Sequence, residues 1–235
     1  MCIIIVAPKG KIIPNTELHR AYASNPDGWG LAAKISRGRI EIVRGFDTKD
    51  LVSAYAEYAG RASIVVHARI ATSGDVDFDN SHPYVLPGHG VIFHNGILKD
   101  VAETNPTKSD TWHYAEELAA QLGVDPLGLT NPDFNRAVEA RAVKNSSRFV
   151  LMSLTEPLRI YNERSGLWAD GMWYSNSSAF PYKSTAKNIV CAAGLPNVKT
   201  IVAEALASTS KKPTYGETRS DRKARRRLNL LRQKV

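Results

Sequence analysis

The chain has few of the features that mark secreted or membrane proteins. Only two cysteines, Cys2 and Cys191, occur among 235 residues, and no CxxC pair is present. Two cysteines cannot build the disulfide framework of a small secreted domain, so we expect a reducing compartment. The apolar runs are far shorter than the roughly 20 residues that a membrane span needs. No basic segment followed by an apolar one opens the chain, so we expect no secretory signal, no membrane contact and a cytoplasmic location, in the host cytoplasm if the chain is viral.

Excess positive charge is missing from most of the chain. The formal net charge of +8 comes from 31 Lys or Arg and 23 Asp or Glu. Residues 211–235 hold ten of the basic and two of the acidic residues, which leaves 21 of each sign in the first 210. The basicity therefore belongs to the tail. We expect one domain over residues 1–208, followed by a basic linker and a helical or disordered tail at 209–235.

Alternating strand and helix patterns predict an α+β fold for the domain. Helical spacing and capping residues predict helices at 15–24, 47–60, 109–123, 131–144 and 198–208, with a basic helix candidate at 219–233. Short apolar runs predict strands at 2–7, 62–70, 90–98, 148–154, 158–163, 172–176 and 188–194, and a hairpin over 29–45. Cys191 lies in the last of these strands, where we expect an inert buried thiol.

Polar residues with chemical potential stand beside these elements. Cys2 precedes the first apolar run, and removal of Met1 would leave it with a thiol and a free α-amine, a nucleophile with its own base. Arg69 follows a buried strand and can hold a carboxylate through two N–H groups. Asn95 and the Gly96 N–H follow a second strand and can point at one spot, as in an oxyanion hole. Asp110, at the start of a predicted helix, can cap that helix or receive an ammonium group.

Each of these patterns also has an ordinary structural explanation. Asn-Gly most often forms a hairpin turn, Ser-Asp before a helix is usually a cap, and a lone arginine usually lies on the surface or pairs with an acid. Many proteins carry an N-terminal cysteine without using it in catalysis. The combination and order of the four patterns therefore carry more weight than any one of them.

In that combination the chain resembles a class II glutamine amidotransferase domain of the Ntn-hydrolase superfamily. The matching stretches follow the family order: Cys2, then residues 25–32 (NPDGWGLA), 67–74 (HARIATSG), 80–84 (NSHPY), 93–96 (FHNG) and 109–111 (SDT). The later stretch GLWADGMWYSN, residues 166–176, resembles a segment of small stand-alone phage and bacterial members.

The resemblance implies a four-layer αββα sandwich of two antiparallel sheets, with the N-terminal strand in the middle of one sheet. It implies that Cys2 attacks the side-chain amide of glutamine, that its α-amine carries the proton, and that Asn95 and Gly96 hold the oxyanion. The substrate-binding residues would be Arg69, Thr72, Ser73, His82 and Asp110. The residues shaping the site would be Asn25, Asp27, Gly28, Trp29 and Gly30. No cofactor and no metal is implied.

The chain departs from the family pattern at one place near the site. The sugar-phosphate and purine branches of the family carry an arginine before the glycine-rich turn, where this chain has SNPDGWG. The group that steadies the catalytic residue is thus missing, or replaced by Asn25 or Asp27. The histidines at 67, 82 and 94 have no zinc-ligand spacing, and histidines at strand ends are more often packing or hydrogen-bonding residues.

Three functions remain open at this stage. The first is a glutaminase-type subunit that supplies ammonia to an acceptor on a separate synthetase. The second is an Ntn amidohydrolase that cleaves a γ-glutamyl-type amide without ammonia transfer. The third is a catalytically retired fold whose basic tail, residues 211–235, binds nucleic acid, although the same tail could contact a protein partner or simply be solvated.

Overall fold

Two antiparallel sheets packed face to face form the centre of the molecule. The computed structural model describes residues 2–125, 127–181 and 232–235. Within them, the larger sheet has seven strands, in the spatial order β11 (Arg232–Lys234), β3 (Arg39–Gly45), β2 (Trp29–Ser36), β4 (Ser63–Ala68), β1 (Ile3–Ala7), β10 (Met172–Tyr174) and β9 (Leu167–Ala169). The smaller sheet has four, in the order β5 (Tyr84–Leu86), β6 (Gly90–Asn95), β7 (Arg148–Ser153) and β8 (Arg159–Tyr161).

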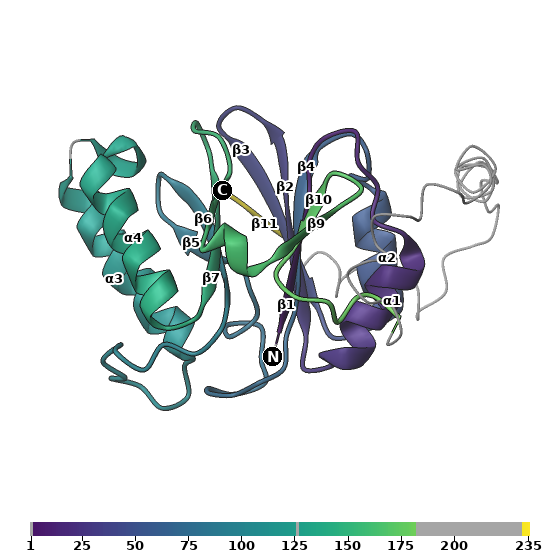
Figure 1. The fold of residues 1–235 in the computed structure, drawn as a ribbon, viewed down its shortest axis with the longest axis horizontal. Coiled ribbons are helices and arrows are strands. Elements are labelled where there is room, and N and C mark those ends of the chain that lie inside the picture. Colours follow the sequence, from purple (N-terminus) through teal and green to yellow (C-terminus); the bar gives the residue numbers. More distant parts are fainter. Residues whose placement is uncertain (1, 126, 182–231) are drawn as a thin grey trace, which may run out of the picture. The chain divides into compact units, whose positions relative to one another are not determined.

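A pair of helices covers the outer face of each sheet (Figure 1). Helices α1 (Asn15–Ser24) and α2 (Thr48–Ala56) lie on the larger sheet, and α3 (Asp110–Val124) and α4 (Pro132–Lys144) lie on the smaller one. Short 3-10 helices occur at η1 (Gly128–Thr130) and η2 (Glu163–Ser165). The expected four-layer αββα sandwich with β1 inside a sheet is thus confirmed.

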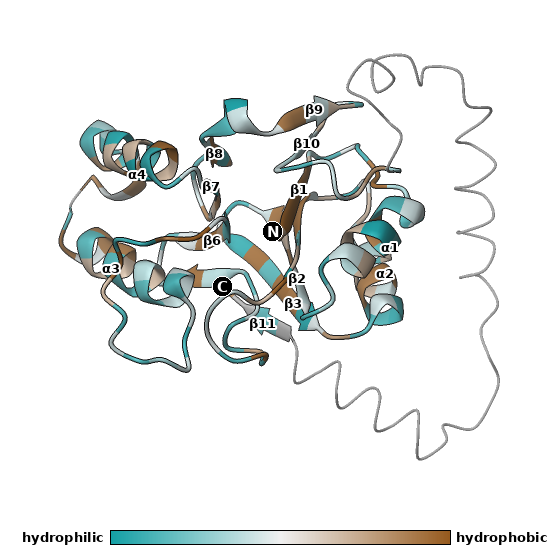
Figure 2. Cartoon of the chain, turned by 60° about the horizontal axis from the view of Figure 1, so that its bottom comes forward, coloured by the Kyte–Doolittle hydropathy of each residue, from teal (hydrophilic) through white to brown (hydrophobic). Residues whose placement is uncertain are grey.

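The apolar pattern of the strands explains the layering. Alternate residues of the two sheets meet in one buried cluster that includes Ile4, Val65, Phe93 and Val150. A second cluster joins the outer face of the smaller sheet to α3 and α4, with Tyr114 and Leu118 against the strands. In Figure 2 the brown of apolar residues marks β1, whereas the helices carry long teal, polar segments. Each sheet buries one face against the other and one against helices, so the central strands are apolar on both faces.

Side-chain caps fix where three of the helices begin. The Asp47 carboxylate accepts a hydrogen bond from the Lys49 N–H, the Ser109 hydroxyl accepts one from Trp112, and the Asn131 amide oxygen accepts one from Asp133. Such bonds satisfy N–H groups that have no partner inside the helix. The cap of α3 is thus Ser109, which leaves Asp110 inside the first helical turn.

The expected helices at 15–24, 109–123 and 131–144 and the hairpin over 29–45 are confirmed. The helix expected at 47–60 forms but ends at Ala56, and the expected strands up to residue 176 form, several of them shorter than expected. The short strands β5 and β9 have no counterpart among the expected elements. The expected strand at 188–194 with Cys191, the helix at 198–208 and the domain boundary at 208 lie outside the described residues and stay predictions.

The end of the tail differs from the expectation of a helical or disordered segment. Residues Arg232–Lys234 form β11, which pairs antiparallel with the edge strand β3. Val235 continues the ladder by exchanging two backbone hydrogen bonds with Ile40, and it packs against the cluster between the sheets. The exposed edge of β3 offers unpaired N–H and C=O groups. Val235 is apolar and reaches the core, which favours an extended strand over a helix at this place.

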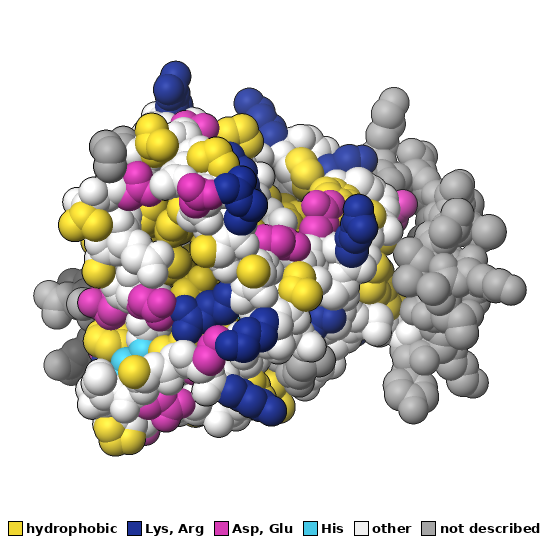
Figure 3. Space-filling model, turned by 60° about the vertical axis from the view of Figure 1, so that its left-hand side comes forward, with side chains coloured by type: hydrophobic (Ala, Val, Ile, Leu, Met, Phe, Trp, Pro, Cys, Tyr) yellow, Lys and Arg dark blue, Asp and Glu magenta, His cyan; other side chains and the backbone are white. Residues whose placement is uncertain are grey.

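Acidic and basic side chains alternate on the face that carries α3 and α4 (Figure 3). This view agrees with the balanced charge of the first 210 residues. Among the described residues, no helix is long and apolar enough to cross a lipid bilayer.

Candidate active site

The candidate site lies where strands of both sheets end. Cys2 directly precedes β1, and β1 pairs with the end of β4 through Ile3 and Ala68, so Cys2 lies beside the start of the segment after β4. The Cys2 thiol donates to the Ile70 carbonyl and accepts from the Ile70 N–H, each at 3.4 Å. Sheet pairing therefore brings the first cysteine to the HARIATSG motif.

A cavity of about 20 Å³ opens at this point. Seven of the expected site residues line it: Cys2, Arg69, Thr72, Ser73, His82, Gly96 and Asp110. Asn95 and the five site-shaping residues do not line it. A cavity of this size holds about one water molecule, so a substrate as large as an amino acid needs the walls to move apart.

Burial governs the acidity of the Cys2 thiol. Burial raises its pKa, and the Ile70 N–H bond and the nearby Arg69 guanidinium oppose the rise without cancelling it. The thiol is therefore predominantly protonated at neutral pH and needs a base to become the nucleophilic thiolate. The α-amine of Cys2 can serve as this base, since it belongs to the same residue as the thiol, but it is free only after removal of Met1.

Asn95 is the last residue of β6 and Gly96 follows it. The two do not form a hairpin turn, because the chain continues into the loop before α3. Gly96 has a φ of +155°, and a Cβ atom there would lie 2.1 Å from the Ser147 hydroxyl oxygen. Only glycine fits this position. Asn95 is fully buried, its Nδ2 donates to the Ser175 hydroxyl at 2.7 Å, and its Oδ1 has no hydrogen-bond partner.

Asp110 fixes the backbone that follows Gly96. Its Oδ2 accepts a hydrogen bond from the Leu98 N–H, and its Oδ1 accepts one from the Thr111 N–H, both at 2.7 Å. Each carboxylate oxygen can accept more than one hydrogen bond. Asp110 can therefore hold this loop and still receive a donor from the cavity that it lines.

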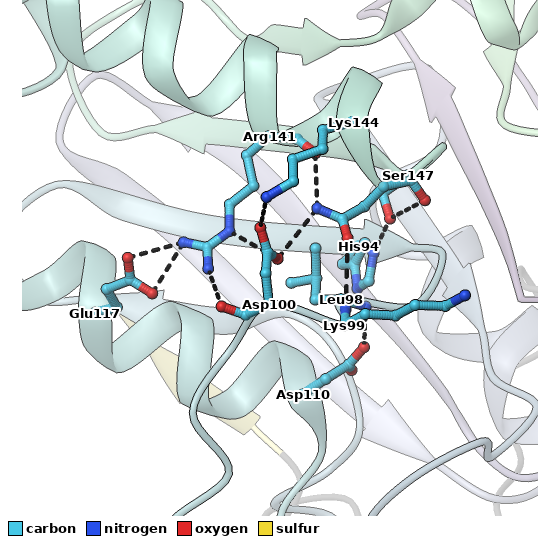
Figure 4. A network of polar contacts seen from close by, with 10 residues as sticks. His94, Leu98, Lys99, Asp100, Asp110, Glu117, Arg141, Lys144 and Ser147 are labelled. Carbon is cyan, nitrogen blue, oxygen red and sulfur yellow. Dashed lines mark hydrogen bonds and ion pairs between the residues drawn. The ribbon is translucent and has the colours of Figure 1, made fainter.

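A polar network continues from this loop to α3 and α4 (Figure 4). Asp100, two residues after Leu98, accepts bonds from Arg141, Lys144 and Asn145. Arg141 also pairs with Glu117 of α3 at 2.8 Å. The segment after Gly96 is thus tied at Leu98 and at Asp100, which restrains the loop that carries the Gly96 N–H.

Arg69 is almost fully buried, and its guanidinium is partly occupied. Its Nη1 donates to the Asp75 carbonyl at 3.0 Å and its Nη2 to the Ser73 carbonyl at 2.8 Å. An arginine side chain has five N–H donors, so donors remain for a ligand. The Ser73 hydroxyl also accepts from the Asp110 N–H at 3.3 Å, which links the Arg69 loop to the start of α3.

The NPDGWG segment supports the site from behind the cavity. The Asp27 carboxylate accepts from the Ala71 N–H at 2.8 Å, and the Asp27 N–H and Gly28 carbonyl bond the Arg69 backbone. At Gly30 a Cβ atom would lie 1.7 Å from the His82 carbonyl oxygen.

Two residues of the same segment are directed elsewhere. The Trp29 indole N–H donates to the Asp47 carbonyl, and the Asn25 amide donates to Ala21 within α1. The segment thus holds the Arg69 backbone through Asp27 and Gly28. The missing side chain at Gly30 leaves room for the His82 carbonyl, and none of the segment's own side chains lines the cavity.

Three buried histidines are held neutral next to the cavity. Burial lowers the pKa of His67 to about 3 and that of His94 to about 4, and burial also lowers the pKa of His82 well below its usual value. The His67 and His82 rings lie 4.0 Å apart, and none of their four nitrogens has a hydrogen-bond partner. His94 bonds the Thr111 and Ser147 hydroxyls. Within the described residues, no group of three or more His, Cys, Asp or Glu could hold a metal ion.

Sequence reasoning missed two residues after β10. The Asn176 amide donates to the Cys2 carbonyl at 2.6 Å, and the Ser175 hydroxyl accepts from the Ile4 N–H at 2.8 Å. The signal was present in MWYSN, where polar residues follow an apolar strand as they do after β4 and β6. What the sequence does not show is that β10 pairs with β1 and so places these residues beside Cys2.

Comparisons with known proteins support the fold. No protein-family model and no curated protein matches the chain. A solved structure described as the allosteric regulatory enzyme of purine biosynthesis aligns with a TM-score of 0.52 and 14% identity, covering 77% of this chain and 43% of that one. Glutamine phosphoribosylpyrophosphate amidotransferase from B. subtilis, complexed with ADP and GMP, aligns over the same shares with a TM-score of 0.48 and 14% identity.

The chain has the fold of a class II glutamine amidotransferase domain. The resemblance drawn from the motifs is thereby confirmed at the level of the fold, which is what 14% identity can show. The chain spans 43% of the length of the solved structures that it matches. Activity and substrate therefore rest on the site of this chain.

Proposed function

We propose that the chain hydrolyses the side-chain amide of glutamine, with Cys2 as the nucleophile once Met1 has been removed. The observation that supports this proposal is the meeting at one cavity of a thiol, a guanidinium, a glycine N–H and a carboxylate, from Cys2, Arg69, Gly96 and Asp110. These are the groups needed to attack an amide and to hold an amino-acid head group. They come from sequence segments that only the folded sheets bring together.

In the proposed reaction the free α-amine of Cys2 takes the thiol proton, and the sulfur attacks the carbonyl carbon of the glutamine side chain. The Gly96 N–H and the Asn95 amide stabilise the oxyanion that forms. The protonated α-amine of Cys2 then gives its proton to the departing nitrogen. The C–N bond breaks, ammonia departs, and a γ-glutamyl thioester remains on Cys2. Water attacks the thioester, glutamate leaves, and the sulfur regains a proton.

The walls of the cavity supply the recognition of the substrate in this proposal. The free N–H groups of Arg69 bind the α-carboxylate, and Asp110 binds the α-ammonium. Thr72, Ser73 and His82 complete the pocket. Because the cavity holds about one water molecule, its walls must move apart for glutamine to enter.

Ammonia release by protein that lacks Met1 tests this proposal. Glutamine should be turned over, asparagine much more slowly because its shorter side chain cannot reach Cys2 from the same head-group site, and Cys2→Ala protein should be inactive. Absence of glutamine turnover, or turnover that survives Cys2→Ala, contradicts the proposal.

The fate of the ammonia separates the two enzyme alternatives. We propose that ammonia passes to an acceptor on a separate partner, in which case glutamine turnover rises when that partner is added. Equal turnover of glutamine and of a γ-glutamyl anilide, with no response to a partner, instead supports an amidohydrolase without transfer. We also expect the tail at 211–235 to contact nucleic acid or a protein partner. Most of its residues lie outside those that the structure describes, so this stays a prediction.

A further inference from the structure

The hydroxyl of Ser175 connects the strand of the nucleophile to the expected oxyanion donor. Ser175 is fully buried and directly follows β10. Its oxygen accepts hydrogen bonds from the Ile4 N–H at 2.8 Å and from Asn95 Nδ2 at 2.7 Å. Its own N–H donates to the Ile4 carbonyl at 2.9 Å. One serine thus binds β1 of the larger sheet and the end of β6 of the smaller sheet.

The Asn95 amide can meet this hydroxyl in two orientations. As it stands, Nδ2 donates to Ser175 and the buried Oδ1 has no partner. After a half-turn of the amide, Oδ1 would accept a hydrogen bond from the Ser175 hydroxyl, and Nδ2 would lie where Oδ1 was. The two ends of an amide are nearly the same size, and a serine hydroxyl can both donate and accept, so either orientation keeps the bond.

The half-turn keeps the number of hydrogen bonds and exchanges an unpartnered acceptor for an unpartnered donor. Within the described residues, the Ser175 hydroxyl accepts two bonds and donates none. After the half-turn it accepts one and donates one, and the Asn95 NH₂ group is available to a ligand oxygen. A buried donor without a partner costs free energy as a buried acceptor does, so the turned amide is favoured when a developing oxyanion accepts from its N–H and is thereby stabilised.

We propose that Ser175 is a positioning residue that holds the Asn95 amide in place relative to Cys2 in either orientation of that amide. This inference rests on the proposed function, since it requires that Asn95 stabilises an oxyanion. Ser175 acts through Asn95 and does not touch the substrate. The neighbouring Asn176 holds the Cys2 carbonyl, so adjacent residues after β10 fix both the nucleophile and the donor.

Kinetics of Ser175→Ala protein without Met1 test the inference. Because the variant leaves Asn95 without its anchor, kcat for glutamine should fall about 10- to 100-fold, a range typical of lost supporting hydrogen bonds. KM should change by no more than about threefold, since the oxyanion forms only after binding. Ser175→Cys, whose larger sulfur keeps a donor and an acceptor but forms weaker hydrogen bonds, should give an intermediate kcat.

A double-mutant cycle separates positioning from a general structural effect. In an Asn95→Ala background, Ser175→Ala should change kcat by no more than about twofold, because the residue through which it acts is gone. Ser153→Ala is the matched control: Ser153 is equally buried, and its hydroxyl also accepts two hydrogen bonds, in its case both from backbone N–H groups. It lies at the opposite end of β7 from the residue that pairs with Asn95. That variant should keep the kcat of the unmodified protein.

Several outcomes would overturn the inference while leaving the proposed function intact. These are an unchanged kcat in Ser175→Ala, an equal fall in the Asn95→Ala background, or an equal fall in Ser153→Ala. Loss of glutamine turnover in the unmodified protein would overturn the proposed function, and this inference with it. Thermal unfolding of every variant shows whether a low rate reflects an unfolded protein, and in that case Ser175→Cys decides the outcome.

Discussion

The middle of the sandwich and its pocket end are built from the same strands in opposite ways. In the middle, Ile4, Val65, Phe93 and Val150 meet in an apolar cluster without polar atoms to satisfy. At the pocket end the same strands lead into buried polar residues. Nine buried side-chain polar atoms among the described residues have no partner, and five of them belong to three residues there: His67, His82 and Asn95.

This contrast separates stability from function. Apolar burial in the middle stabilises the fold, whereas a buried polar atom without a partner costs about 1–3 kcal/mol. The pocket end therefore lowers the free energy of unfolding, and the apolar middle offsets that cost. Unsatisfied groups that persist at one place point to a ligand or water that binds there. The comparison predicts that substitutions in the apolar middle mainly lower the free energy of unfolding, whereas substitutions at the pocket end mainly change activity.

Replacing the nucleophile should have the largest effect and should affect activity alone. Cys2→Ala should lower glutamine turnover by at least about 1000-fold, because the thiol forms the covalent intermediate in the proposed reaction. Among the described residues the thiol makes two weak hydrogen bonds, both with Ile70 at 3.4 Å, so the midpoint of thermal unfolding should change little. Ammonia release and calorimetry measure both. A large loss of stability would show that Cys2 is instead part of the core.

Gly96→Ala should damage both activity and stability. The new methyl group would lie 2.1 Å from the Ser147 hydroxyl, so the loop that carries the proposed oxyanion N–H must shift. We expect roughly a 100-fold fall in kcat and a loss of about 1–3 kcal/mol in the free energy of unfolding.

Gly38→Ala is the matched control for that variant. Gly38 also has a positive φ, +78°, but a Cβ atom there would meet nothing within 4 Å. It should lose about 1 kcal/mol from backbone strain and keep its turnover. An equal loss of turnover in both variants would mean that Gly96 has no special relation to the site.

Acid should destabilise the protein through the buried histidines. The pKa of His67 is lowered to about 3 and that of His94 to about 4, whereas an unfolded histidine titrates near 6.5. Below that value the unfolded chain binds protons that the folded chain does not, so stability is present above pH 6.5 and is lost as the pH falls. Between pH 7 and 5 each such histidine should cost about 2 kcal/mol.

Urea unfolding at a series of pH values measures this loss. The fall should become smaller in His67→Phe protein, which has one titrating group fewer. Stability that stays constant from pH 7 to 5 would show that these histidines are already hydrated, and so charged as easily, in the folded protein.

The smallest expected effect is a gain in the free energy of unfolding when the buried His67 ring is replaced. His67→Phe replaces a buried ring that has two unpartnered nitrogens with an apolar ring, and it should raise the free energy of unfolding at pH 7 by about 1 kcal/mol. Phe93→Ala in the apolar middle should lower it by about 3–5 kcal/mol. Urea unfolding of the two variants compares them. A fall in stability for His67→Phe would mean that its nitrogens bind structural water.

The sequence predicted the fold and most of the site because both depend on local patterns. Apolar runs ending in polar residues located β1, β4 and β6, and the order of the motifs identified the architecture. Five substrate-binding candidates and two of the three catalytic ones line one cavity. The orientation of Asn95, the support from Ser175 and the pairing of β11 with β3 depend on contacts between distant segments. No local pattern contains that information.

The central claim is that the free α-amine of Cys2 is the base for its own thiol. Mass spectrometry of the intact protein tests this claim most directly. Purified protein is treated with a glutamine analogue that bears a diazoketone in place of the amide. We predict that the chain lacks Met1 and gains one adduct, on Cys2, and that excess free glutamine protects it. Protein that lacks Met1 and forms no adduct, or an adduct that forms equally well while Met1 is retained, would contradict the account.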